Sequence, residues 1–253
     1  MAVAAYRHMP ELAAEFTAIL PGFGAGSDLA EWAAGYARSH AGRCHWDAQF
    51  VGRHVPKSCL NIGGAPYLFE FALKKQFPDI EVTSVDLAPE RFPNAAAMIG
   101  IRTVRANIET EAPDFAGKFD FVVFTEIFEH LRIDILGTVA RVRELLADDG
   151  RLYLTTPNGL SLDAWRRSML RGRTGPSLVD EWSKLSRLGH MGHVREYSAT
   201  EVEEVLIHCG FSIEQRQFRV QSMVARPKRD LLLKLRSALA DEIVIVSRKQ
   251  KLN

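Results

Sequence analysis

From residue 57 onward, short apolar runs alternate with longer segments of helical periodicity, and this alternation restricts the fold more than any other feature. The runs SCLNIG, EVTSVD, RTVRANI, FDFVVFT and RLYLTTP are rich in Val, Ile, Leu, Phe and Thr, which is typical of strands buried on both faces. Before the last of them, one helical face is formed by Ile135, Val139, Val142 and Leu146. Strands that alternate with helices predict an α/β domain with a mostly parallel sheet and right-handed crossovers.

Three segments depart from this alternation. Residues 1–56 have helical spacing and no strand-like alternation, so we expect an N-terminal helical segment packed on a domain that spans 57–253. Residues 159–198 form an insert with several arginines and two tryptophans, Trp165 and Trp182. We expect the tryptophan side chains to pack, and a platform for a sugar is the weaker alternative. Residues 224–240 lie between the strand candidates FSIEQRQF and DEIVIVSR and predict a basic amphipathic helix that covers the sheet edge or forms a homodimer contact.

Composition narrows the class of protein. Lys and Arg total 32 and Asp and Glu total 31, a balance that counts against a dedicated nucleic-acid binder. The three cysteines have no paired spacing and therefore predict neither a disulfide framework nor a zinc site. The N-terminus lacks the features of a signal peptide, and no stretch approaches 18 uncharged apolar residues. We expect a cytoplasmic protein without a membrane span.

Small residues follow the first strand, and an acid ends the second. Gly63, Gly64 and Ala65 allow a tight turn that a ligand can approach closely, and Asp86 comes 23 residues after Gly63. In an open α/β sheet, ligands bind beyond the carboxyl ends of the strands, where such an acid accepts hydrogen bonds from ribose hydroxyls. Each feature alone is equally compatible with a ligand-free turn or a helix-capping acid. Together they favour a nucleoside ligand.

The sequence of the same turn distinguishes between a dinucleotide and a nucleoside ligand without pyrophosphate. A dinucleotide site needs the pattern G-x-G-x-x-G, because the helix after the turn must hold a pyrophosphate. Counted from Gly63, the third position is Ala65 and the sixth is Leu68, so the last glycine is missing. A ligand without pyrophosphate is favoured, and a nucleotide-dependent oxidoreductase is the weaker alternative.

The ordered set of motifs resembles the class I S-adenosylmethionine (SAM)-dependent methyltransferases. CLNIGGAPYLF is similar to their first motif, SVDLAPERF to the second-strand acid, and RANIE to the segment that flanks adenine. FDFVVFTEIFEHL resembles the fourth-strand motif E-x-x-E-H-L, and LLADDGRLYLTTPN and HVREYSATEVEEVLIHCGFSI resemble the fifth strand and the later helix and strand. The resemblance covers about residues 57–219. It departs at Asn61, where the family has an acid, and at Ala65 and Tyr67, where it has glycines.

This resemblance implies a Rossmann-like sheet of seven strands, mostly parallel with an antiparallel last strand, and SAM as cofactor. It places the turn against the ligand backbone, Asp86 on the ribose, and Asn107 with Ile108 beside adenine. Phe124 and Thr125 would line the methionine end. The implied cofactor-binding residues are Asn61, Gly63, Gly64, Ala65, Asp86, Leu87, Asn107, Ile108, Phe124 and Thr125.

Three side chains are the candidates for catalysis. Glu126 and His130 are four residues apart and would share a helical face if a helix begins directly after the fourth strand. His193, which the resemblance puts near the acceptor, is preferred to His190 as a base or positioning residue. A helix-start acid, a packed histidine and a surface histidine are the alternative interpretations. The same three side chains could bind a divalent ion such as Mg²⁺, although no tight spacing demands it.

The acceptor is the least determined part of the prediction. TTPN, the insert and HVREYS together resemble methyltransferases of polysaccharide assembly, which implies a hydroxyl of a small polar acceptor, a sugar or an oligosaccharide. A mannoside of methylmannose polysaccharide synthesis is the narrowest form of this hypothesis. N-methylation of another small molecule or a macromolecule is the alternative, although the base-methylating motif [DN]-P-P-[YF] is replaced by Thr125-Glu126-Ile127-Phe128.

Overall fold

The structure is a computed structural model that describes residues 4–188, 192–220 and 227–250. The five apolar runs fold into strands β2 (Ser58–Ile62), β3 (Glu81–Asp86), β4 (Arg102–Arg105), β5 (Phe119–Thr125) and β6 (Leu146–Pro157). The later strands are β7 (Phe211–Val220) and β8 (Glu242–Lys249), and a two-residue strand, β1 (Ala4–Ala5), precedes them all. Leu146 begins β6, so its predicted place in the preceding helix is wrong.

Within the described part of the chain, the strands form one sheet in the order β1-β7-β8-β6-β5-β2-β3-β4. Strands β2 to β6 pair in parallel, whereas β8 is antiparallel to both β6 and β7. This confirms the predicted mostly parallel sheet with an antiparallel last strand. The addition is β1, which pairs with β7 and is too short to leave a periodic signal in the sequence.

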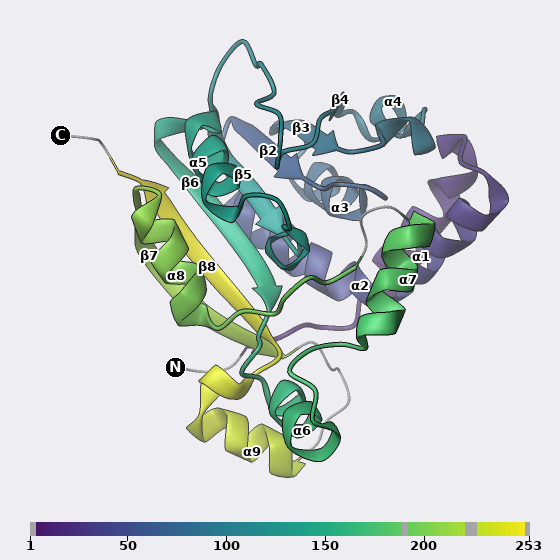
Figure 1. Cartoon of the computed structure of the whole chain (residues 1–253). Coiled ribbons are helices and arrows are strands. Elements are labelled where there is room, and N and C mark those ends of the chain that lie inside the picture. Colours follow the sequence, from purple (N-terminus) through teal and green to yellow (C-terminus); the bar gives the residue numbers. More distant parts are fainter. Residues whose placement is uncertain (1–3, 189–191, 221–226, 251–253) are drawn as a thin grey trace.

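Helices cover both faces of the sheet (Figure 1). The longer ones are α1 (Pro10–Ile19), α2 (Ser27–Arg53), α3 (Leu68–Gln76), α5 (Ile135–Leu145), α6 (Leu162–Arg171), α7 (Leu178–Leu188), α8 (Ala199–His208) and α9 (Pro227–Leu235). Shorter ones are α4 (Ala95–Ile99), η1 (Leu20–Phe23), η2 (Pro89–Arg91), η3 (Phe128–His130) and η4 (Ser237–Leu239). None of the helices described is both long enough and apolar enough to cross a bilayer.

The alternation of side chains along each strand divides the core into two layers. In β5, Phe121 and Val123 belong to the cluster formed with α1 to α4, and Val122 and Phe124 to the cluster formed with α5 and α8. The N-terminal helices therefore share a core with the sheet.

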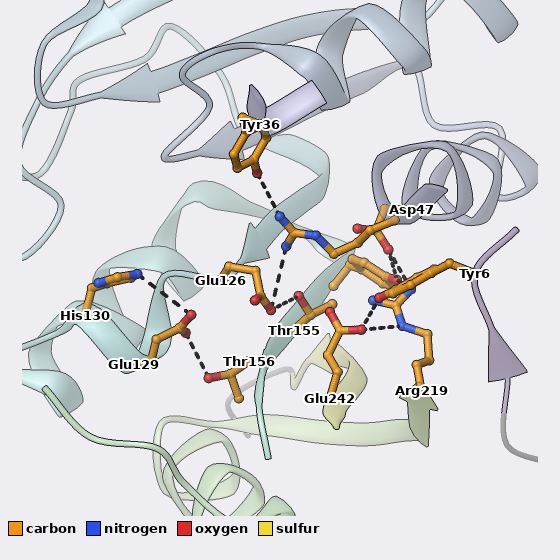
Figure 2. A network of polar contacts seen from close by, with 12 residues as sticks. Tyr6, Tyr36, Asp47, Glu126, Glu129, His130, Thr155, Thr156, Arg219 and Glu242 are labelled. Carbon is orange, nitrogen blue, oxygen red and sulfur yellow. Dashed lines mark hydrogen bonds and ion pairs between the residues drawn. The ribbon is translucent and has the colours of Figure 1, made fainter. Parts of the chain in front are cut away.

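A buried ionic network ties helix α2 to the far strands (Figure 2). The guanidinium of Arg219 in β7 is fully buried and donates to Asp47 of α2 at 2.7 Å and to Glu242 of β8 at 3.0 Å. The hydroxyl of Tyr153 also donates to Asp47, and that of Tyr6 donates to Glu242. Burial raises the pKa of Glu242 to about 7. These buried contacts link α2 directly to β6 and β7, and through Arg219 to β8.

Candidate active site

At Gly63 and Gly64, the first residues of the turn after β2, there is no room for a side chain. Gly63 has φ of 76°, in the left-handed region that favours glycine. A Cβ on Gly63 would overlap Ile127, and one on Gly64 would overlap Ser84 Oγ and Glu70 Oε1. The backbone of this turn therefore lies close to Ile127, Ser84 and Glu70, and a larger residue at position 63 or 64 would have to displace them.

Asp86 links this turn to the end of β3. One carboxylate oxygen of Asp86 accepts the backbone N–H of Ala65 at 3.1 Å, and the other accepts that of Ala88 at 3.0 Å. The structure thus brings together the two features that the sequence predicts as one ligand site, with Asp86 half-buried.

A buried acid lies below the turn, and sequence reasoning missed it. Glu70 of α3 is fully buried, and its Oε1 accepts the side-chain amide of Asn61 at 2.8 Å. Burial raises the pKa of Glu70 to about 7, and the hydrogen bond from Asn61 opposes this shift. Asn61 stands where the resemblance predicts an acid, and its side chain is turned toward Glu70 of the next helix. The one available signal was a glutamate inside the apolar run LFEFAL.

A cleft of about 230 Å³ adjoins Asp86 and is lined by Leu87, Arg105, Ala106, Asn107 and Glu111. The backbone N–H of Ala106 donates to the carbonyl of Asp86 at 3.1 Å, which fixes the wall of the cleft to the end of β3. Two of the residues predicted around the ligand, Leu87 and Asn107, line it. A larger hollow, of about 370 Å³, lies between α5 and residues 112–118, and no predicted site residue borders it.

Two other predicted residues have their side chains in the core. Ile108 and Phe124 are 7% and 1% exposed and pack in the apolar layer beneath α5 and α8. Thr125 ends β5 and is half-buried, at the same edge of the sheet as Asp86.

Glu126 follows β5 in a left-handed conformation, with φ of 55°. Its Oε1 accepts the hydroxyl of Thr155 at 3.0 Å and lies 3.7 Å from Nη1 of Arg43. Arg43 comes from helix α2, is buried, and donates to the hydroxyl of Tyr36 at 2.7 Å (Figure 2). The N-terminal helical segment thus supplies a charged side chain to the site, which sequence reasoning did not predict because α2 lies far from the motifs.

Glu126 and His130 do not share a helical face. The left-handed residue is followed by the short turn η3, and α5 begins only at Ile135. The carboxylate beside His130 is instead Glu129, whose Oε1 is 3.8 Å from His130 Nε2 and whose Oε2 accepts the hydroxyl of Thr156 at 2.9 Å (Figure 2). Glu129 is fully buried, and burial together with the nearby Glu126 raises its pKa well above the usual range.

His193 joins this pair from a distant segment. The rings of His130 and His193 meet edge to face with centroids 4.9 Å apart, and Nδ1 of His130 donates to the carbonyl of Gly192 at 2.8 Å. The backbone N–H of His193 donates to the carboxylate of Glu181 at 2.7 Å. Burial lowers the pKa of His193, which Glu181 opposes. His190 lies outside the described residues.

The tryptophans of the insert do not pack as expected. Trp165 and Trp182 are 59% and 64% exposed, so the prediction that they pack is wrong. Both lie on amphipathic helices, α6 and α7, whose apolar sides are not covered by the described part of the chain.

The chain is similar to known methyltransferases. A family model for a methyltransferase domain matches residues 37–216, a range that includes Arg43, the turn, Asp86 and His193. No curated protein matches the chain.

Solved structures share the fold at low sequence identity. The N-methyltransferase NodS of Bradyrhizobium japonicum, in complex with S-adenosylhomocysteine, is 16% identical with a TM-score of 0.52, over 83% of this chain and 87% of NodS. The 1,6-didemethyltoxoflavin N1-methyltransferase of Burkholderia thailandensis is 19% identical with a TM-score of 0.56, over 95% and 88%. A putative O-methyltransferase of Nostoc punctiforme is 17% identical with a TM-score of 0.56, over 95% and 70%.

Proposed function

Because the chain belongs to the methyltransferase-domain family, we propose that it transfers the methyl group of SAM to a hydroxyl of a small polar acceptor, a sugar or glycan. The observation that carries this proposal is the cluster of Glu129, His130 and His193 beside the carboxyl end of β5. A mannoside of methylmannose polysaccharide synthesis is its narrowest form.

The cofactor is assigned to the edge of the sheet around the turn after β2. Asp86 receives the ribose hydroxyls, and the cleft bordered by Leu87 and Asn107 receives the adenine side. The structures of NodS and of the Burkholderia enzyme contain S-adenosylhomocysteine, the product that SAM leaves after methyl transfer. Their shared fold supports the same cofactor here.

A hydroxyl acceptor needs help that an amine does not. In the transfer, the bond from sulfur to the methyl carbon breaks as a bond from the acceptor oxygen to that carbon forms, and the hydroxyl proton must leave. Since the pKa of an alcohol is far above 7, positioned acid–base groups contribute about 10²–10⁴-fold. In this proposal, the carboxylate of Glu129 and the imidazoles of His130 and His193 supply these acid–base groups beside the bound acceptor.

The acceptor is tested with methyl-tritiated SAM against sugars, oligosaccharides, lipid-linked glycans and small amines. We expect label in a hydroxyl-bearing acceptor, recovered as a methyl ether. Transfer to amines alone would refute O-methylation and favour the N-methyltransferase alternative.

The cluster is tested with His193→Ala, and His208→Ala is the matched control because His208 is exposed at the end of α8. We expect His193→Ala to lower the turnover of the accepted substrate at least tenfold and to leave the affinity for S-adenosylhomocysteine within about twofold, a difference of less than about 0.5 kcal/mol. Unchanged turnover would remove His193 from the reaction.

A further inference from the structure

Glu129, His130 and His193 have the composition and proximity of a metal site. One ligand atom from each residue lies within 4.8 Å of those of the other two. His193 belongs to a distant segment, since its neighbour Gly192 comes 62 positions after His130. We propose that these three side chains bind a divalent transition-metal ion such as Mn²⁺. The ligand set differs from that expected from the sequence, because Glu129 replaces Glu126.

The first argument is the state of the Glu129 carboxylate. It is fully buried, and its Oε1 has no hydrogen-bond partner among the described residues. A buried carboxylate without a full set of partners is costly, and a bound cation is one of the ways in which proteins offset that cost.

The surrounding charges leave Glu129 as the acid available to a cation. Glu126, Glu181 and Glu196 are the other carboxylates close to the cluster. Each of these three forms an ion pair with a basic side chain: Glu126 with Arg43, Glu181 with Lys184 and Glu196 with Arg167. Nε2 of His130 lies 3.8 Å from Oε1 of Glu129, and this contact is an ion pair only when the imidazole is protonated. The three pairs are locally neutral, so a divalent ion at Glu129 would not face an uncompensated positive charge.

The second argument is the way in which the ligands are held. A histidine that binds a metal through one ring nitrogen commonly donates from the other to a carbonyl. His130 does so through Nδ1 to Gly192, which orients Nε2 toward Glu129. The carbonyl of Glu129 accepts the backbone N–H of Val194 at 2.8 Å, so the two segments that carry the three side chains are fixed to each other.

The ligand types favour one group of ions. Two imidazoles with one carboxylate suit Mn²⁺, Fe²⁺, Co²⁺ or Zn²⁺, whereas Mg²⁺ prefers a shell of oxygens. Neighbouring ligand atoms of such ions lie about 3 Å apart. Metal binding would therefore draw the three side chains closer than the 4.8 Å within which their ligand atoms now lie. Three protein ligands leave positions open for oxygens of another molecule.

This inference deepens the proposed function and rests on it for the identity of that other molecule. A bound divalent ion lowers the pKa of a coordinated hydroxyl, which is the assistance that an alcohol acceptor requires. Glu129, His130 and His193 would then orient the acceptor by holding the ion. Loss of the acceptor's hydroxyl proton would not need a histidine as the base.

Metal binding is tested without any acceptor, so that it is separate from methyl transfer. The full chain is titrated with Mn²⁺, with free Mn²⁺ followed by electron paramagnetic resonance. We expect one site per chain, weakened at least tenfold in Glu129→Gln and in His193→Ala and unchanged in His208→Ala. Each variant is also titrated with S-adenosylhomocysteine, which reports whether the fold is intact.

The proposal is overturned if the wild-type chain shows no saturable Mn²⁺ site, or if a folded His193→Ala variant retains full affinity. Should Glu129→Gln fail to fold, the partly exposed His193 decides alone. Failure of every acceptor in the methylation assay would refute the proposed O-methylation and leave the Mn²⁺ titration informative.

Discussion

Glu70 beneath the glycine turn gives the protein a pH-dependent stability that one substitution should remove. Its carboxyl is fully buried, and burial raises its pKa from 4.5 to about 7. The folded state therefore binds this proton more tightly than the unfolded state does, and ionised Glu70 opposes folding. That cost is fully present above pH 7 and disappears as the pH falls toward 4.5. This rise in the pKa of Glu70 corresponds to about 3 kcal/mol at high pH.

Glu70→Gln tests this value, because glutamine keeps an oxygen that can accept the amide of Asn61. Urea unfolding is followed by circular dichroism from pH 5 to pH 8.5 for the wild type, Glu70→Gln and the exposed control Glu204→Gln. All other titrating groups cancel in the difference between wild type and variant. We expect that difference to change by about 2–3 kcal/mol over this range for Glu70→Gln, with the variant gaining in relative stability as the pH rises.

A constant difference across the pH range would refute the reasoning, because it would mean that Glu70 has the same pKa in both states. The control Glu204→Gln makes the same chemical change at an exposed position and shows what that change does by itself to the free energy of unfolding. Affinity for S-adenosylhomocysteine, measured on the same samples, shows whether the turn above Glu70 keeps its shape.

Three further outcomes are expected. Asp86→Ala should weaken SAM binding at least tenfold, about 1.4 kcal/mol by calorimetry, and unchanged affinity would exclude Asp86 from the ribose. Gly64→Ala forces a methyl group into Ser84 Oγ and should lower both SAM affinity and the melting temperature, whereas a normal melting curve with normal affinity would show that the turn can move. Arg219→Met leaves the buried Asp47 carboxylate without its cation and should cost about 3–5 kcal/mol in urea unfolding; a loss under about 1 kcal/mol would show that the network relaxes or takes up protons.

The order of strands and helices could be predicted from the sequence because each signal is local. Runs buried on both faces are continuously apolar, and helices repeat every 3.6 residues, so neither pattern depends on distant parts of the chain. The turn at Gly63 and the acid at Asp86 were predicted to meet for a topological reason, since parallel neighbouring strands end at the same edge. Their contact through Ala65 N–H follows from that topology.

The acid–base side of the site depends on contacts that no local pattern contains. Arg43 reaches Glu126 from a helix whose own sequence carries no motif, and Glu70 of α3 lies beside the turn and accepts the amide of Asn61. The sequence indicated Glu126 rather than Glu129 as the partner of His130, because that pairing assumed a helix directly after β5. The left-handed conformation of Glu126 interrupts such a helix.

The sequence by itself determined the class of fold and the edge of the sheet at which the turn at Gly63 and Asp86 meet, because periodicity and strand order are properties of successive residues. The tertiary structure alone decided which charged groups face one another there. Burial, counter-charges and hydrogen bonds between segments distant in the chain set that arrangement, and they exist only once the sheet and its covering helices have packed.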